Sequence, residues 1–233
     1  MKILIVAAMD NEIAIVLDKL KENKIDVKEI EGFKFYLGSL YNKEIILVQS
    51  GVGRINSGIL ITIAKLNFDF DLIINIGIAG GLKELSIYDI VVGEKTIYGD
   101  VDVTSYLNKY TYGQMSGCPR YFDGSIRVLD LIKGDKDVHF GTICSCDKFT
   151  TSDEEVRKLI NNYFSDLNVL AFDMESACFA QACYRLSIDF IAIRFISDII
   201  GSAFQSDVYA KNEEDVQKFE KCNNYILRIL EKI

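Results

Sequence analysis

Four charged side chains stand beside strand-like apolar runs, and their types suit acid–base chemistry on a small molecule. Asp198 ends an apolar run that should form a buried strand, and Arg194 lies earlier in the same run. Because side chains alternate along a strand, Arg194 and Asp198 are expected to project from one face. Glu12 and Glu175 each lie where a predicted strand passes into a helix. Ligand sites of α/β sheets form at the carboxyl ends of strands, so this pattern predicts a rim of carboxylates with Arg194 just beneath.

Purely structural interpretations compete with this one. Arg194 and Asp198 could form a buried ion pair, which is costly and is weak evidence of a contribution to stability. Glu12 falls in the first turn of a helix predicted to run to about Lys21, where an acid interacts favourably with the helix dipole by about 0.3–1 kcal/mol. The only histidine, His139, lies in an apolar run and is expected to be structural. A Ser–His or Cys–His relay elsewhere is thereby excluded, so acid–base chemistry is expected to rest on carboxylates.

The elements that must hold these side chains alternate between strands and helices. Strands are predicted at Lys2–Ala8, Phe33–Leu37, Glu44–Gln49, Asp71–Ile76, Asp89–Val92, Lys95–Tyr98, Val138–Ser145 and Phe190–Asp198, with a short one at 170–173. Helices are predicted up to Lys21, at Ile55–Leu66, at Ser125–Lys133, after the capping box Ser152…Glu155, around Cys178–Leu186 and at Glu213–Ile233. This order indicates an α/β fold with three α/β/α layers around a central twisted mixed sheet.

Size and composition limit the classes of function. The 233 residues, half of them hydrophobic, fit a single domain spanning 1–233. A net charge of −8 argues against binding to nucleic acid or to an anionic membrane. No signal-peptide pattern and no apolar run of about 18 residues occurs, so we expect a cytoplasmic protein. The six cysteines include no CxxC pair; Cys144 and Cys146 share a strand face without further ligands, so no metal is expected.

Two glycine-rich turns and one long segment complete the candidate features. The turn at 50–54 leads into a helix, and a second follows the strand that ends at Ile76. The glycines at 51, 53 and 58 do not form GxGxxG, because position 56 is asparagine, so no dinucleotide cofactor is expected. Such turns let a backbone approach a ligand. The tyrosine-rich stretch 99–122 is long for a loop and is typical of a lid or a subunit interface.

The chain resembles the 5′-methylthioadenosine/S-adenosylhomocysteine nucleosidases, within the wider nucleoside phosphorylase/hydrolase fold. Eight segments in order carry the resemblance over almost the whole chain: AAMDNE at 7–12, SGVGRINS at 50–57, INIGIAGGL at 74–82, DVDVT at 100–104, YGQMSGCP at 112–119, SCDKF at 145–149, FDMES at 172–176 and IRFISD at 193–198. Each segment alone is weak, whereas all eight in this order are specific. The resemblance implies hydrolysis of the N-glycosidic bond between adenine and a 5′-thio-substituted ribose, without a cofactor.

That reaction needs three tasks, and the resemblance assigns each to a carboxylate. The bond breaks through a ribosyl oxocarbenium cation, which requires nearby negative charge, a base for water and a proton for the departing adenine. Asp198 matches the general acid at adenine N7, and Glu12 matches the base. Glu175 matches the group that holds the ribose hydroxyls and faces the cation. Arg194 matches a residue that helps to position the water and Glu12.

Further binding residues follow from the same resemblance. Ser197 would orient Asp198, Met174 would pack on the sugar, and Phe149 would stack on adenine while the Thr150 backbone reads its edge. The 5′-alkylthio group is expected near Met9, Val52 and a residue around 208–209. In a homodimer, Val103 and the segment 112–115 would reach in from the partner subunit.

Three alternatives stay open. A phosphorylase would need a cation for phosphate, and Arg54 is the candidate, but Asp10 and Glu12 would repel that dianion. A second alternative is a hydrolase of another purine nucleoside, inosine-like or futalosine-like. The third is a nucleoside-binding protein without catalysis, because Ile78 stands where family members usually carry Ser or Thr. Ser116, where many relatives have Pro, is a smaller departure.

Overall fold

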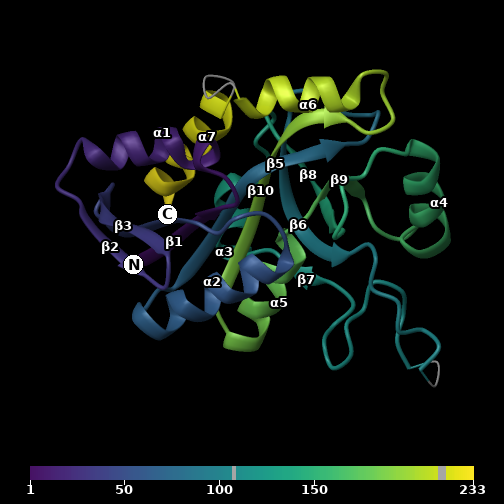
Figure 1. The fold of residues 1–233 in the computed structure, drawn as a ribbon, viewed down its shortest axis with the longest axis horizontal. Coiled ribbons are helices and arrows are strands. Elements are labelled where there is room, and N and C mark those ends of the chain that lie inside the picture. Colours follow the sequence, from purple (N-terminus) through teal and green to yellow (C-terminus); the bar gives the residue numbers. More distant parts are fainter. Residues whose placement is uncertain (107–108, 215–218) are drawn as a thin grey trace.

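The computed structural model describes residues 1–106, 109–214 and 219–233, with the backbone alone for 212–214 (Figure 1). The strands are β1 (Lys2–Ala7), β2 (Asp26–Ile30), β3 (Phe33–Leu40), β4 (Lys43–Gln49), β5 (Leu72–Gly81), β6 (Ile90–Tyr98), β7 (Phe122–Asp123), β8 (His139–Ser145), β9 (Val169–Asp173) and β10 (Asp189–Ile199). The helices are α1 (Asp10–Lys21), α2 (Arg54–Asn67), α3 (Ile126–Ile132), α4 (Asp153–Tyr163), α5 (Ser176–Leu186), α6 (Gln205–Glu214) and α7 (Glu220–Lys232).

The strands form one mixed sheet that closes on itself at one end. Its order is β10-β6-β8-β9-β5-β1-β4-β3-β2, and β10 also pairs in parallel with β5. Strands β5, β9, β8, β6 and β10 therefore make a closed ring, from which β1, β4, β3 and β2 extend. The predicted mixed sheet is confirmed, whereas ring closure was not predicted. Closure depends on β5, which pairs with β1 near its start and with β9 at Gly80 and Gly81.

Helices cover both faces of the sheet, as a sheet with two apolar faces requires. One face carries α1, α3 and α7, whose residues Val16, Val128 and Ile229 belong to one buried cluster with β1, β4, β5 and β10. The other face carries α2 and α5, where Leu60 and Phe179 belong to a second cluster. Figure 1 shows α1 and α7 on the side opposite α2 and α5. The predicted three-layer α/β/α architecture is confirmed.

Sequence patterns placed most elements correctly. The strands predicted separately at Asp89–Val92 and Lys95–Tyr98 are the single strand β6, the two-residue strand β7 was not predicted, and three further elements differ. The helix predicted at Glu213–Ile233 begins instead at Glu220 as α7, and a separate helix, α6, precedes it; positions 215–218 lie outside the described residues. Helix α6 is polar along its length and offers no apolar stripe to detect. Strand β2 is an exposed, charged edge strand, a pattern that hides strands from hydrophobic periodicity. Strand β5 continues through the glycine-rich turn to Gly81.

In the described part of the chain, the helices all lack the length and apolar character that a membrane crossing requires.

Candidate active site

One cavity opens where several strands end, and polar and apolar side chains line it together, as in small-molecule sites. Strands β1, β5, β9 and β10 and the loops after β4 and β8 contribute to it. Its lining includes ten residues named from the sequence: Met9, Glu12, Val52, Ile78, Phe149, Thr150, Met174, Glu175, Ser197 and Asp198. The structure therefore brings the three predicted carboxylates together around one cavity, although their chemical roles stay predictions.

Glu12 lies in the first turn of α1, just after β1, and hydrogen bonds hold its side chain. The residue is 3% exposed, and its carboxylate accepts hydrogen bonds from the backbone N–H groups of Met9 (2.8 Å) and Ile78 (2.8 Å). A Cβ at Gly77 would lie 2.8 Å from Glu12 Oε1, so this close approach of β5 requires glycine. Burial raises the pKa of Glu12, and the two backbone donors oppose that shift. A carboxylate has four lone-pair positions, so Glu12 keeps acceptor capacity for a water molecule.

Asp198 is buried at the end of β10 and is 1% exposed. Its Oδ1 accepts a hydrogen bond from Ser197 Oγ (2.6 Å), and its Oδ2 accepts one from Gln205 Nε2 (2.7 Å). Burial raises the pKa of Asp198, while both donors lower it. A carboxyl group whose environment favours the proton has the character of a general acid. Gln205 was not identified from the sequence, because it lies in a segment without hydrophobic periodicity.

The expectation that Arg194 and Asp198 share one face of a regular strand is wrong. Opposite β5, the register of β10 shifts between Ile196 and Asp198, so a bulge at Ser197 interrupts the alternation. Arg194 consequently pairs with Asp173 rather than with Asp198: its Nε donates to Asp173 Oδ2 at 2.8 Å. The structural alternative of an Arg194–Asp198 ion pair is wrong for the same reason.

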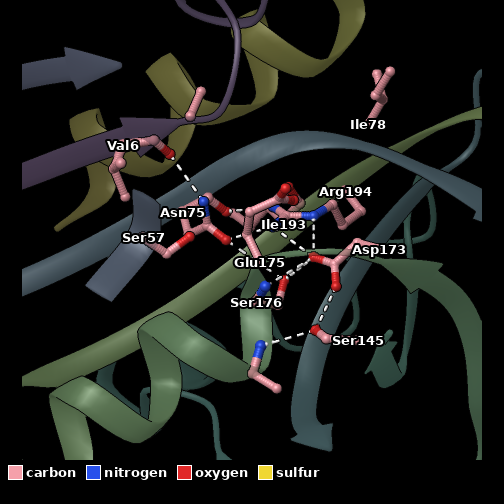
Figure 2. A network of polar contacts seen from close by, with 12 residues as sticks. Val6, Ser57, Asn75, Ile78, Ser145, Asp173, Glu175, Ser176, Ile193 and Arg194 are labelled. Carbon is pink, nitrogen blue, oxygen red and sulfur yellow. Dashed lines mark hydrogen bonds and ion pairs between the residues drawn. The ribbon is translucent and has the colours of Figure 1, made fainter. Parts of the chain in front are cut away.

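Asp173 is the centre of a buried polar network that the sequence analysis missed (Figure 2). Its carboxylate accepts hydrogen bonds from Arg194, from the Ser145 hydroxyl and from the hydroxyl and backbone N–H of Ser176. Arg194 also donates to the backbone and side-chain oxygens of Asn75. Arg194 on β10 thus links Asp173 on β9 to Asn75 on β5. Its positive charge also lowers the pKa of Glu12. Asp173 could have been identified from the sequence, because it is an acidic residue at the end of the apolar run that precedes Glu175.

Replacing Asp173 by Asn should destabilise the protein far more than the loss of a surface ion pair. Removing one charge from a buried pair leaves Arg194 uncompensated, which costs about 3–5 kcal/mol. The matched control is Asp166→Asn, because Asp166 forms an exposed ion pair with Arg120 whose loss should cost about 0–1 kcal/mol. Urea unfolding of both variants measures the difference. If the unfolding free energy of Asp173→Asn fell no further than that of Asp166→Asn, the buried Asp173 network would not stabilise the fold more than a surface ion pair does.

Glu175 lies between β9 and α5, and the residue is 8% exposed. Its Oε1 accepts a hydrogen bond from the backbone N–H of Gly53 (2.7 Å), in the turn before α2. Gly53 has φ +95°, a conformation that favours glycine. Burial, and then the charge of Asp173, raise the pKa of Glu175 to about 7. A positive charge beside Glu175 would therefore favour its ionised form.

The raised pKa of Glu175 predicts a pH-dependent stability. The folded protein binds this proton more tightly than the unfolded chain, so the contribution is complete below pH 4.5 and is lost as pH rises through about 7. The shift corresponds to roughly 3 kcal/mol. Glu175→Gln stays neutral, so its unfolding free energy should fall less over this pH range than that of the unchanged protein.

Urea unfolding at a series of pH values measures this effect. Glu154→Gln is the matched control, because the Glu154 side chain is 78% exposed, and its profile should follow that of the unchanged protein. Superimposable profiles for Glu175→Gln and the unchanged protein would contradict the assignment of the raised pKa to Glu175.

The remaining predicted residues lie at different distances from the cavity. Phe149 is half exposed at the mouth, with its ring edge-on to Tyr209 at a centroid distance of 4.9 Å. Tyr209 also lines the cavity, in keeping with the residue expected near 208–209. Val103 is not part of the described lining, and Tyr112 stacks on Tyr163. Because Val103 and 112–115 were assigned to a partner subunit, these two assignments stay predictions.

Comparison with known proteins gives one consistent result. The model of the phosphorylase superfamily matches residues 2–233. A 5′-methylthioadenosine/S-adenosylhomocysteine nucleosidase of Oceanobacillus iheyensis is 34% identical over 207 residues, covering 86% of this chain and 87% of that protein. The corresponding nucleosidase of Listeria welshimeri is 35% identical over 211 residues, covering 85% and 87%. The Streptococcus pneumoniae nucleosidase, solved with the transition-state inhibitor MT-ImmA, is similar with a TM-score of 0.90 at 29% identity, over 100% of this chain and 99% of that one.

Proposed function

The chain belongs to the family of 5′-methylthioadenosine/S-adenosylhomocysteine nucleosidases within the phosphorylase superfamily, and we propose that it hydrolyses these two nucleosides to adenine and the 5-thio-substituted ribose. The whole chain, 1–233, would act as one catalytic domain. The observation that carries the proposal is that Glu12, Glu175 and Asp198 line one cavity.

In the proposed mechanism, each carboxylate has one task. Glu12 accepts a proton from water as the water oxygen bonds to the anomeric carbon. The bond to adenine N9 breaks with its electron pair leaving on the base, and Asp198 gives its proton to N7. Glu175 holds the ribose hydroxyls and stabilises the positive charge that develops on the sugar. Two groups act indirectly: Ser197 fixes Asp198 through a hydrogen bond, and Arg194 acts through its charge.

Water is favoured over phosphate as the nucleophile by the charges near the site. Glu12 and the exposed Asp10 lie in the first turn of α1, where they would repel a phosphate dianion. The candidate phosphate ligand, Arg54, forms an ion pair with Asp100 and donates to the carbonyl oxygen of Ser145 at 3.1 Å. Lys148 lines the cavity but pairs with Glu155 at 2.9 Å. These contacts support hydrolysis rather than phosphorolysis.

Ile78, which stands where relatives usually carry Ser or Thr, is compatible with catalysis. Its contact with Glu12 is made by the backbone N–H, which any residue other than proline provides. Replacement of a hydroxyl side chain by Ile78 therefore preserves the hydrogen bond that holds the proposed base. This contact favours an enzyme over a nucleoside-binding protein without turnover.

A homodimer is also part of the proposal. Helix α2 exposes apolar side chains along its length, including Ile55 (77% exposed), Ile59 and Leu66 (80% exposed), and Val52 in the preceding turn lines the cavity. Exposed apolar surface of this kind is typical of protein–protein contacts. A second copy packed against α2 would lie beside the cavity mouth, where Val103 and 112–115 of that copy are expected to contribute.

Adenine release from 5′-methylthioadenosine in phosphate-free buffer tests the proposed reaction. We expect the same rate with and without added phosphate, and free 5-methylthioribose as the second product. Strict dependence on phosphate would make the protein a phosphorylase. Binding of the nucleoside without turnover under either condition would favour the non-catalytic alternative.

A further inference from the structure

A glutamine of α6 forms a hydrogen bond with Asp198, the proposed acid of the candidate site. Gln205 begins α6 and is 5% exposed. Its Nε2 donates to Asp198 Oδ2 at 2.7 Å and to the carbonyl oxygen of Thr150 at 2.9 Å. Its Oε1 accepts a hydrogen bond from the backbone N–H of Gly201 at 2.9 Å. Both hydrogens of this amide nitrogen are therefore directed at groups that line the cavity.

These two acceptors are the groups to which the proposed function assigns adenine. Asp198 is expected to bind adenine at N7, and the backbone of Thr150 is expected to read the adjoining edge of the base. The exocyclic amino group of adenine, next to N7, is a planar NH₂ with two donors, like the carboxamide of Gln205. A base that reached Asp198 and the Thr150 carbonyl would meet the Gln205 amide in its way.

We propose that Gln205 mimics the amino group of adenine in the ligand-free protein and must leave Asp198 and Thr150 for the base to bind. This inference rests on the proposed function of the site. It assigns Gln205 as a displaceable occupant of the base subsite rather than a permanent support of the acid.

The hydrogen bonds of Gln205 satisfy two buried acceptors, the Asp198 carboxylate and the Thr150 carbonyl oxygen. A carboxylate and a carbonyl oxygen that lost their donors in an empty, buried site would be destabilising. Gln205 satisfies both while the site is empty. Tyr209, one helical turn later, meets the ring of Phe149 edge-on. Helix α6 thus contacts the polar groups expected to bind the edge of adenine and also Phe149, which is expected to stack on its ring. Movement of α6 would break the contacts of Gln205 and of Tyr209 together.

The same exchange prepares Asp198 for its proposed task. A donor to Oδ2 favours the ionised carboxylate, and Gln205 accordingly lowers the pKa of Asp198. Departure of Gln205 frees Oδ2 of Asp198 to face the base. Binding of the base and release of Asp198 from Gln205 are therefore linked through one side chain.

Calorimetric titration with free adenine tests the proposal. Gln205→Ala removes the competing amide, so adenine should bind more tightly, by about tenfold for the hydrogen bonds that no longer have to be broken. Ser206→Ala is the matched control, because Ser206 is the exposed neighbour on the same helix, and its affinity should equal that of the unchanged protein. Equal or weaker binding of adenine by Gln205→Ala would overturn the proposal.

A crystal structure of the unchanged protein with adenine gives an answer that does not depend on how the variant folds. The expected result is adenine on Asp198 and Thr150, with the Gln205 amide beyond hydrogen-bond distance of both. Adenine bound while Gln205 still contacts Asp198 would overturn the inference and leave the proposed function intact. Failure of the unchanged protein both to bind adenine and to release it from 5′-methylthioadenosine would overturn the proposed function and the inference together.

Discussion

Asp198→Asn is expected to lower kcat for adenine release by about 10²–10⁴-fold, the usual contribution of a positioned general acid. Asparagine keeps the shape of the side chain and can still bond to Ser197 and Gln205, but it has no proton to give to adenine N7. The buried position of Asp198 and its raised pKa both favour the protonated form that this task requires. Steady-state kinetics on 5′-methylthioadenosine measure the loss.

The control for this prediction is Asp207→Asn, an equivalent change at an exposed position of α6. It should leave kcat unchanged. Activity of Asp198→Asn within a few-fold of the unchanged protein would exclude Asp198 as the acid, and adenine would then have to depart without a proton from this group.

Glu12→Gln is expected to have an effect of similar size, about 10²–10⁴-fold on kcat, because an amide cannot accept the proton of the attacking water. The carboxylate now accepts from the backbone N–H groups of Met9 and Ile78. In the variant, an NH₂ group must face one of these donors, so a loss of stability of about 1–3 kcal/mol should accompany the loss of activity. Thermal unfolding and kinetics on the same preparation separate the two effects.

Asp10→Asn is the matched control, because Asp10 is an exposed acid in the same helical turn. Its kcat should change little. Turnover by folded Glu12→Gln at the rate of the unchanged protein would show that another group activates the water. A fall in kcat for Asp10→Asn as large as that for Glu12→Gln would show that the charge of the turn, rather than a specific base, is what matters.

The three carboxylates could be located from the sequence because local patterns determine where strands end. Glu12 and Glu175 follow short apolar runs, and Asp198 terminates one, so each could be assigned to a strand end without knowing the topology. The common location of strand ends in α/β folds then brings them together. The α/β/α layers follow from the same alternation of strands and helices.

What the sequence could not reveal depends on non-local pairing. The bulge at Ser197 is a matter of register between β10 and β5, and it redirects Arg194 to Asp173. Ring closure likewise needs β10 to pair with both β5 and β6. Gln205 was missed for a different reason: it begins α6, a helix without an apolar stripe, so no periodic pattern marks its buried amide.

The source of the oxygen in the sugar product shows whether water or phosphate attacks the anomeric carbon. The reaction is run on 5′-methylthioadenosine in water labelled with heavy oxygen and in the presence of phosphate, and the products are analysed by mass spectrometry. We expect free 5-methylthioribose that carries the label on its anomeric oxygen, together with adenine. Unlabelled sugar phosphate as the product would contradict this expectation, because the nucleophile would then be phosphate and Glu12 would have no water to activate.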